Sequence, residues 1–252
     1  MNPFDMKFWL GYLSEWLGTI AVVMIAGTSP MIKKIRRIEF RFPRREATFS
    51  LLLFALIFFL AFQFFSNPIF EFLRTFAFAL QGGEIAQRML IALLSLIPVI
   101  LLMAVRGQPL KSAGWSKENT RAGLTLGVVL LILVVFLSGK FLPLLQGISS
   151  EQGSLLFVIL VWVAAEETIF RGYIQLRLMS YLGNNWGLLA TTLLYVLWQL
   201  PGNELLTQFS TQWPLLVIAL VQGLLLGWIM RKTHHVSAPI LLRVASTWLM
   251  LL

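Results

Sequence analysis

The 252-residue chain contains no cysteine, only two histidines, and charged side chains at only 12% of its positions. Without cysteine, the sequence excludes disulfide bonds, a thiol nucleophile and cysteine-ligated zinc. Soluble domains carry about 25% charged residues, so the low charge argues against a soluble enzyme and against a disordered chain. Apolar residues are abundant instead, at 58%, with a mean hydropathy of +0.81. This composition indicates an integral membrane protein.

Apolar stretches of about the length that crosses a bilayer follow one another along the chain. They cover residues 8–27, 49–65, 85–105, 122–137, 154–173, 186–200, 214–230 and 238–252. We therefore expect an all-α, polytopic membrane helix bundle with about eight transmembrane helices. The first stretch begins with several aromatic residues, so a position along the membrane interface is its alternative. The start of the chain lacks a basic region and a small-residue cleavage site, so we expect no cleaved signal peptide.

The formal net charge of +9 is large for so apolar a chain. Fifteen of the twenty Lys and Arg residues fall in four segments that such a bundle places on one side, residues 33–45, 106–121, 171–177 and 231–232. The positive-inside rule assigns these basic loops to the cytoplasm and both chain ends to the opposite side. Topology thus explains the charge, and we expect the lipid bilayer rather than nucleic acid as the partner.

Two adjacent glutamates, Glu166 and Glu167, lie near the end of the fifth stretch. A charged group at mid-membrane costs about 2.5–3.5 kcal/mol on insertion scales and is rarely kept without a partner or a function. Glu167 and Arg171 are spaced i, i+4, so they share a helix face and can pair, whereas Glu166 faces another direction. The pattern favours a site. The alternative is a Glu–Arg pair at a helix end that emerges into the interface.

The sequence EETIFRG at residues 166–172 resembles the E-E-x-x-x-R-G motif of the CPBP family, which includes CAAX endopeptidases and bacteriocin-processing (Abi-type) intramembrane proteases. Residues 109–115 resemble the loop that precedes the family core, and residues 237–242 resemble the lead-in to its last motif. The resemblance implies a CPBP/CAAX-endopeptidase-like core at residues 105–252. Residues 1–104 would then be variable N-terminal transmembrane helices with a basic cytoplasmic loop.

The resemblance also implies which positions form a site. In the family, the first glutamate activates a water, the arginine orients the glutamates, and histidines in F-x-x-x-H and H-x-x-x-N motifs bind metal or stabilise an oxyanion. Here the second motif aligns on residues 195–199 and the third on residues 243–247, so that Gln and Arg replace the histidines and Thr replaces the asparagine. The candidate catalytic positions are Glu166, Glu167, Arg171, Gln199, Arg243 and Thr247.

Arg243 changes the chemistry that the motif predicts. A guanidinium neither loses its proton nor coordinates a cation, and it would repel a divalent metal. We therefore expect no bound metal and no cofactor, although the resemblance allows zinc, and we predict that Arg243 forms a salt bridge with Glu166. The histidines, His234 and His235, are expected to form an ordinary pair at the membrane interface.

Two further features have simpler interpretations. Gly223 and Gly227 form a G-x-x-x-G pattern, which indicates close helix packing within the bundle, with dimerisation as the alternative. Glu15 lies within the first stretch, so we expect it to be protonated or close to the interface.

Three functions remain open from the sequence. The first is a non-catalytic or impaired CPBP homologue that binds a membrane peptide or partner protein. The second is an active intramembrane endopeptidase in which Glu166 is the general base for a water held by Glu167, with Gln199 and Thr247 or Ser246 as oxyanion donors. The third is an unrelated transporter. The expected location is a bacterial-type inner or plasma membrane, with a thylakoid or other organelle membrane as the alternative. The sequence does not predict the oligomeric state.

Overall fold

A computed structural model describes residues 6–203 and 209–252. Within these residues the chain forms helices and no strand. The long helices are α1 (Met6–Ala26), α3 (Pro43–Ser66), α5 (Glu84–Val105), α6 (Thr120–Leu137), α8 (Ser150–Glu167), α10 (Asn184–Gln199), α11 (Phe209–Thr233) and α12 (Ser237–Leu251). The prediction of an all-α helix bundle is confirmed.

Every predicted apolar stretch forms a helix, but not all of these helices are equally long. Among the described residues, six helical segments are long and apolar enough to cross a membrane. One of them, Ser150–Leu182, is a continuous run through α8 and the helices that follow it. Helices α10 and α12 contain only 16 and 15 residues. The predicted count of eight is therefore approximate.

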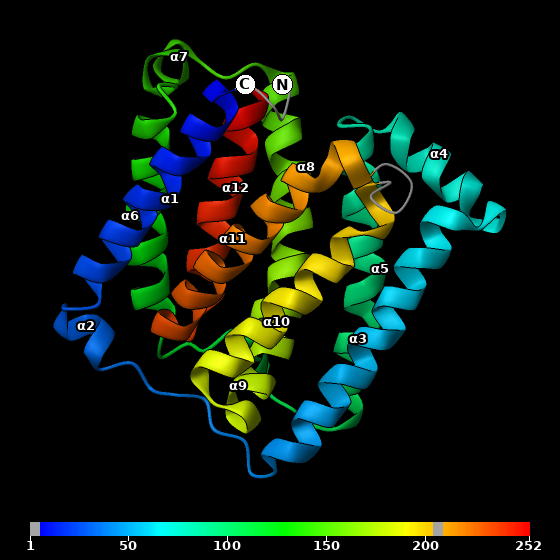
Figure 1. The fold of residues 1–252 in the computed structure, drawn as a ribbon, viewed down its shortest axis with the longest axis vertical. Coiled ribbons are helices and arrows are strands. Elements are labelled where there is room, and N and C mark those ends of the chain that lie inside the picture. Colours follow the sequence, from blue (N-terminus) through cyan, green and yellow to red (C-terminus); the bar gives the residue numbers. More distant parts are fainter. Residues whose placement is uncertain (1–5, 204–208) are drawn as a thin grey trace.

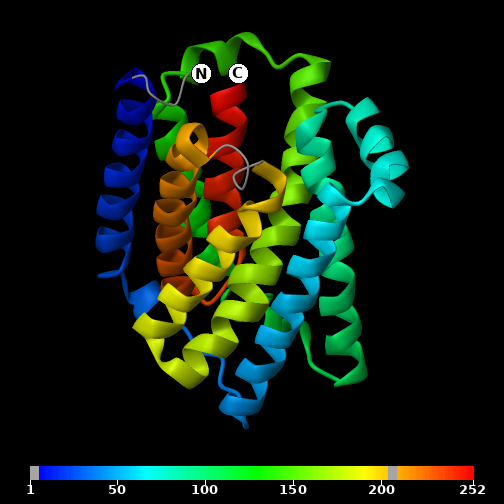
Figure 2. The ribbon, with the colours of Figure 1, turned by 45° about the vertical axis from the view of Figure 1, so that its right-hand side comes forward.

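Short elements connect the long helices alternately at the two ends of the bundle (Figures 1 and 2). At one end lie α2 (Pro30–Lys33), η2 (Leu110–Ala113) and α9 (Leu176–Leu182). We call it the basic end, because the Lys- and Arg-rich connecting segments lie there. At the other end lie η1 (Pro68–Phe70), α4 (Glu71–Ala79), α7 (Phe141–Gln146) and η4 (Pro201–Asn203), together with the start of α1 and the end of α12. We call it the terminal end. The acidic residues Asp5 and Glu204 lie outside the described residues.

Helix α8 occupies the interior, where it packs against α5 on one side and α12 on the other. Helix α12 in turn packs along α6, and α10 packs along α11 and α9. The outward faces are apolar as well, with exposed leucine and phenylalanine side chains such as Leu52, Phe59 and Leu101. In a bilayer such residues face lipid, while the helices satisfy their own backbone hydrogen bonds.

Directly after Glu166 and Glu167, the chain widens into a π-helical segment, η3 (Thr168–Gln175), before α9 begins. π-Helical turns are rare in proteins, and those that occur often lie at functional sites. A Cβ atom at Gly172 would lie 2.1 Å from the carbonyl oxygen of Ala113, so only glycine lets η2 pack this closely against η3. Nearby, Trp115 Nε1 donates to Thr168 Oγ1 at 3.2 Å.

The same loop also contacts the start of α12. The backbone N–H of Val236 donates to the carbonyl of Gly114 at 3.1 Å. The fold thus brings together three segments that are far apart in sequence, at or near the basic end: residues 109–115, 166–172 and 236–242.

Candidate functional site

Arg243 on α12 lies at the centre of a buried cluster of charges. Its Nη2 donates to Glu166 Oε2 at 2.6 Å, and its Nη1 donates to Glu167 Oε1 at 2.8 Å. The side chains of all three residues are at most 4% exposed. The predicted ion pair between Arg243 and Glu166 is therefore present. The second bond, to Glu167, was not predicted.

Both carboxylate oxygens of Glu166 are occupied by donors. Besides Arg243 on Oε2, the indole nitrogens of Trp162 and Trp198 donate to Oε1 at 2.7 and 3.1 Å. Trp162 lies one helical turn before Glu166, and Trp198 comes from α10. These three donors use three of the roughly four acceptor positions of the carboxylate, so at most one position, on Oε2, is left for a water.

Glu167 pairs with a second arginine. The Nε of Arg171 lies 3.4 Å from Glu167 Oε2, and both side chains are fully buried, which confirms the predicted i, i+4 pair. The Arg171 guanidinium lies 4.9 Å from the ring centroid of Tyr195, as expected for a cation–π contact. The two carboxylates are thus matched by two guanidinium groups.

A cavity of about 370 Å³ lies beside Arg243 and is lined by residues of α1, α5, α8, α10, α11 and α12. Its polar lining includes Arg88, Gln199, Gln222, Arg243 and Thr247. Gln199 Oε1 accepts from Arg88 Nη1 at 3.3 Å. The predicted site residues therefore divide into two groups: Glu166, Glu167, Arg171 and Arg243 form the charge cluster, and Gln199 and Thr247 line the cavity beside it.

Arg88 and Gln222 were missed by the sequence interpretation. Arg88 lies one turn inside α5 and belongs to none of the four basic segments. The sequence signal that could have placed Arg88 inside the membrane is a lone arginine followed by a long apolar run. Gln222 lies in the middle of α11 and belongs to no recognised motif.

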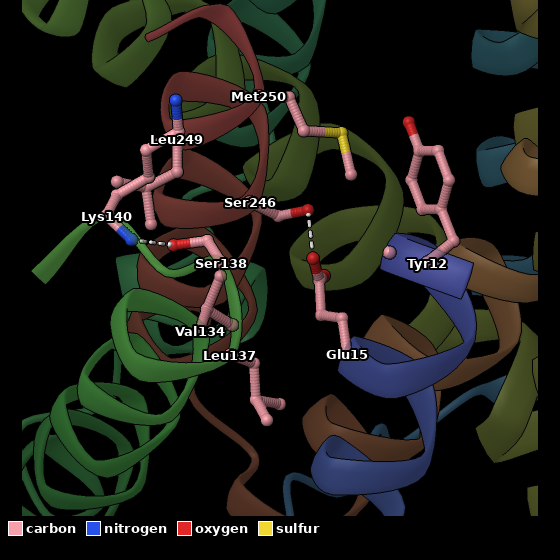
Figure 3. Close-up of a pocket in the computed structure, with 10 residues that line it drawn as sticks. Tyr12, Glu15, Val134, Leu137, Ser138, Lys140, Ser246, Leu249 and Met250 are labelled. Atoms are coloured by element: carbon pink, nitrogen blue, oxygen red, sulfur yellow. Dashed lines mark hydrogen bonds between the residues drawn. The ribbon is translucent and has the colours of Figure 1, made fainter. Parts of the chain in front are cut away.

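A second cavity, of about 230 Å³, lies between α1, α6 and α12 (Figure 3). The Ser246 hydroxyl points at Glu15 and donates to its Oε2 at 2.8 Å. Glu15 is 7% exposed, so it lies within the bundle rather than at its surface. Ser246, considered as an oxyanion donor, is instead bonded to Glu15.

A separate charge cluster was missed entirely. Glu46, at the start of α3, accepts hydrogen bonds from both terminal nitrogens of Arg106, from Gln108 Nε2 at 3.0 Å and from Arg177 Nε at 3.2 Å. Arg177 is fully buried. The assignment of Arg171 and Arg177 to a basic loop was wrong, because η3 and α9 continue α8 without a break and keep both residues inside the protein.

The histidines lie in the turn between α11 and α12, at the basic end. Both side chains are buried rather than exposed at an interface. His235 Nδ1 hydrogen-bonds with Ser237 Oγ at 2.8 Å and His235 Nε2 with Thr120 Oγ1 at 3.3 Å. Burial lowers the pKa of His235, and burial together with the charge of Arg37 lowers the pKa of His234 to about 4.

The donor set does not fit zinc. Among the described residues, no group of three or more His, Cys, Asp or Glu side chains could hold a metal ion. The two adjacent carboxylates are each bonded to guanidinium nitrogens, and a cation cannot share oxygens with two arginines without strong repulsion.

The glycines of α11 face neighbouring helices of the same chain. A Cβ at Gly223 would lie 2.8 Å from the Thr192 side chain, and the carbonyl of Gly227 accepts from Gln175 Nε2 at 2.7 Å. The G-x-x-x-G pattern therefore serves packing within the bundle.

Comparison with known families adds one match. Residues 150–249 match the family described as type II CAAX prenyl endopeptidase Rce1-like. The matched segment runs from the start of α8 into α12, and it contains the whole charge cluster around Arg243. No curated protein and no solved structure matches the chain.

Proposed function

Because residues 150–249 match the type II CAAX prenyl endopeptidase Rce1-like family, we propose that the chain is a non-catalytic homologue of the CPBP/CAAX-protease type that binds a membrane peptide or partner protein. One observation carries this proposal. Arg243, at the position where the family keeps a histidine, donates to both motif glutamates. Its guanidinium takes the place that the resemblance assigns to a metal or an activated water.

The cavity beside Arg243 supports a binding role. At about 370 Å³, it lies within the range of ligand pockets. Its apolar walls suit a transmembrane peptide, while Gln199, Gln222 and Thr247 supply amide and hydroxyl groups. Such groups can pair with backbone polar atoms that find no water at this depth.

The second candidate is an active endopeptidase with Glu166 as general base. The observation in its favour is that Gln199 and Thr247, the predicted oxyanion donors, line the same cavity as Arg243. In this candidate a water would share Glu166 with Arg243 and the indoles of Trp162 and Trp198. An unrelated transporter does not agree with the family match.

We further propose that the basic end faces the cytoplasm, in accord with the positive-inside rule. Residues 105–252 would be the family core, and residues 1–104 an N-terminal addition that packs against it through α1, α3 and α5. That the chain is a multi-pass membrane protein follows from its apolar helices and its family.

A cross-linking experiment tests binding. A photoreactive amino acid at Thr247 should cross-link a membrane peptide or protein in intact membranes. The same group at the lipid-facing Leu101, which is 58% exposed, is the control. Equal cross-linking of the same species from both positions would contradict a specific cavity site.

A cleavage assay separates the two candidates. Purified wild-type protein and Glu166→Gln are compared on a panel of membrane peptides, and the proposal expects no hydrolysis by either. Hydrolysis by wild type that vanishes in Glu166→Gln would establish the endopeptidase. Stoichiometric, tightly bound zinc in the wild type would also overturn the role given to Arg243.

A further inference from the structure

A shallow groove of about 660 Å³ lies at the basic end, where the loop from α2 enters α3. Arginines and apolar side chains both line it. Its lining residues are Arg41, Phe42, Pro43, Arg44, Arg45, Thr48, Phe49 and Leu52. The groove shares no lining residue with the cavity beside Arg243 and plays no part in the proposed function.

Three arginines, Arg41, Arg44 and Arg45, give the groove its charge, and all three are exposed. Within the described part of the chain, none of them forms an ion pair. The neighbouring carboxylate of Glu46 does not offset them, because it turns inward to Arg106 and Arg177. The groove is therefore a concentrated site of positive charge.

Helix stability does not explain these arginines. Arg44 and Arg45 lie in the first turn of α3, where the helix dipole disfavours cations. Two of the guanidinium groups lie over aromatic rings: Arg41 is 5.3 Å from the centroid of Phe42, and Arg45 is 5.6 Å from that of Phe49. Stacking of this kind holds a guanidinium in place and leaves its N–H edge available to an anion.

The groove continues into the lipid-facing surface of α3. Arg45, Thr48, Leu52, Leu56 and Phe59 are spaced three or four residues apart, so they form one stripe along the helix. Leu52, Leu56 and Phe59 are 61%, 47% and 57% exposed. The stripe thus runs from a cationic start at the basic end to an apolar surface deeper in the membrane.

We propose that this groove binds one anionic phospholipid, such as a phosphatidylglycerol. The arginines bind its phosphate with bidentate, charge-assisted hydrogen bonds, and an acyl chain lies along the stripe. A free phosphate would satisfy the arginines but not the apolar part of the groove, so the bilayer is the source of the ligand.

Lipid binding can be measured by native mass spectrometry of the purified protein, titrated with phosphatidylglycerol or phosphatidylcholine. We expect at least tenfold tighter binding of phosphatidylglycerol. The variant R41Q/R44Q/R45Q should lose that preference at least tenfold. The matched variant K33Q/K34Q/K117Q removes the same charge from exposed residues at the same end, and it should change binding less than twofold.

Equal losses in the two triple variants would mean general attraction between a basic surface and anionic lipid, and would overturn the proposal. Competition by millimolar inorganic phosphate would show a free-anion site and would also overturn it. A photoactivatable phosphatidylglycerol gives an independent measurement on the unaltered protein. Its cross-links should concentrate in residues 41–59, and cross-links spread evenly over the exposed helices would contradict the groove.

Discussion

The guanidinium of Arg243 donates to the carboxylate of Glu166 at 2.6 Å, across 77 residues of sequence. The resemblance to the CPBP family assigns position 243 to a histidine that serves a metal or a water. Here the chain supplies its own cation in that place. Both glutamates of the motif are retained, but their charge is matched by arginines within the protein.

Arg243→Ala should destabilise the protein strongly, because it leaves two buried carboxylates short of a partner. Loss of one member of a buried ion pair typically costs about 3–5 kcal/mol. The double variant Glu166→Ala/Arg243→Ala should recover part of this loss, as measured by thermal unfolding in detergent. If the double variant is no more stable than Arg243→Ala alone, ion pairing with Glu166 is not what holds Arg243.

Gly172→Ala should prevent η2 from packing on η3. The added Cβ would meet the backbone carbonyl of Ala113 at 2.1 Å, and a backbone atom cannot rotate away as a side chain can. We expect low yield or a large fall in the unfolding temperature. Gly153→Ala on α8 is the control, because no atom lies within 4 Å of its added Cβ; it should be neutral or slightly stabilising. Similar behaviour of the two variants would contradict close packing at Gly172.

Glu46→Gln should weaken the junction of α3, α5 and α9. The neutral amide leaves Arg177, which is fully buried, without a carboxylate, and we expect a loss of about 3 kcal/mol. Glu118→Gln removes an exposed partner of Arg36 and should cost less than about 1 kcal/mol. Thermal unfolding of the two variants side by side provides the check, and equal losses would mean that the Glu46 cluster adds no more than a surface pair.

Acid should destabilise the protein through His234. Its pKa is about 4 in the fold and 6.5 in a model peptide, so the unfolded chain takes up the proton first as the pH falls. The contribution of His234 to the free energy of unfolding is fully present above pH 6.5. It is lost as the pH falls from 6.5 to 4, and the loss reaches at most about 3 kcal/mol. Asn tolerates the left-handed backbone that His234 adopts at φ 46°.

His234→Asn should therefore fold and show a smaller fall in unfolding temperature over this pH range. His235, whose pKa is also lowered by burial, remains in the variant, so the unfolding temperature of the variant should still fall somewhat with pH. Parallel curves for wild type and variant would show that His234 does not contribute to acid sensitivity.

The helices could be predicted from sequence because each long apolar run must satisfy its own backbone hydrogen bonds in lipid. The Arg243–Glu166 pair could be predicted because the motif alignment puts an arginine at a position that the resemblance assigns to the same site as the glutamates. Glu46 belongs neither to an apolar run that predicts a helix nor to a motif that predicts a partner. Its partners Arg106 and Arg177 lie 60 and 131 residues away, and nothing local distinguishes it from a loop glutamate.

The structure differs from the sequence prediction at two other places, α4 and Arg171, and again the cause is tertiary packing. The nine-residue α4 is too short to leave an apolar signal of spanning length. Arg171 resembles the first charge of a loop because it follows an apolar run, but the π-helical turn carries it on within the protein. In both cases the deciding information is tertiary packing, which a single sequence does not display.

The two shortest long helices are the ones that carry Gln199 and Arg243. At 1.5 Å per residue, the 16 residues of α10 and the 15 of α12 span only about 24 and 22 Å, less than a hydrocarbon core of about 30 Å. Because α12 is almost wholly buried, the mismatch with lipid falls on α10, whose Leu193 is 58% exposed, and it is met by local thinning of the bilayer or by lipid rearrangement. We therefore expect the bilayer to thin beside α10, which would bring the cavity that Gln199 lines closer to water than a full-length helix would.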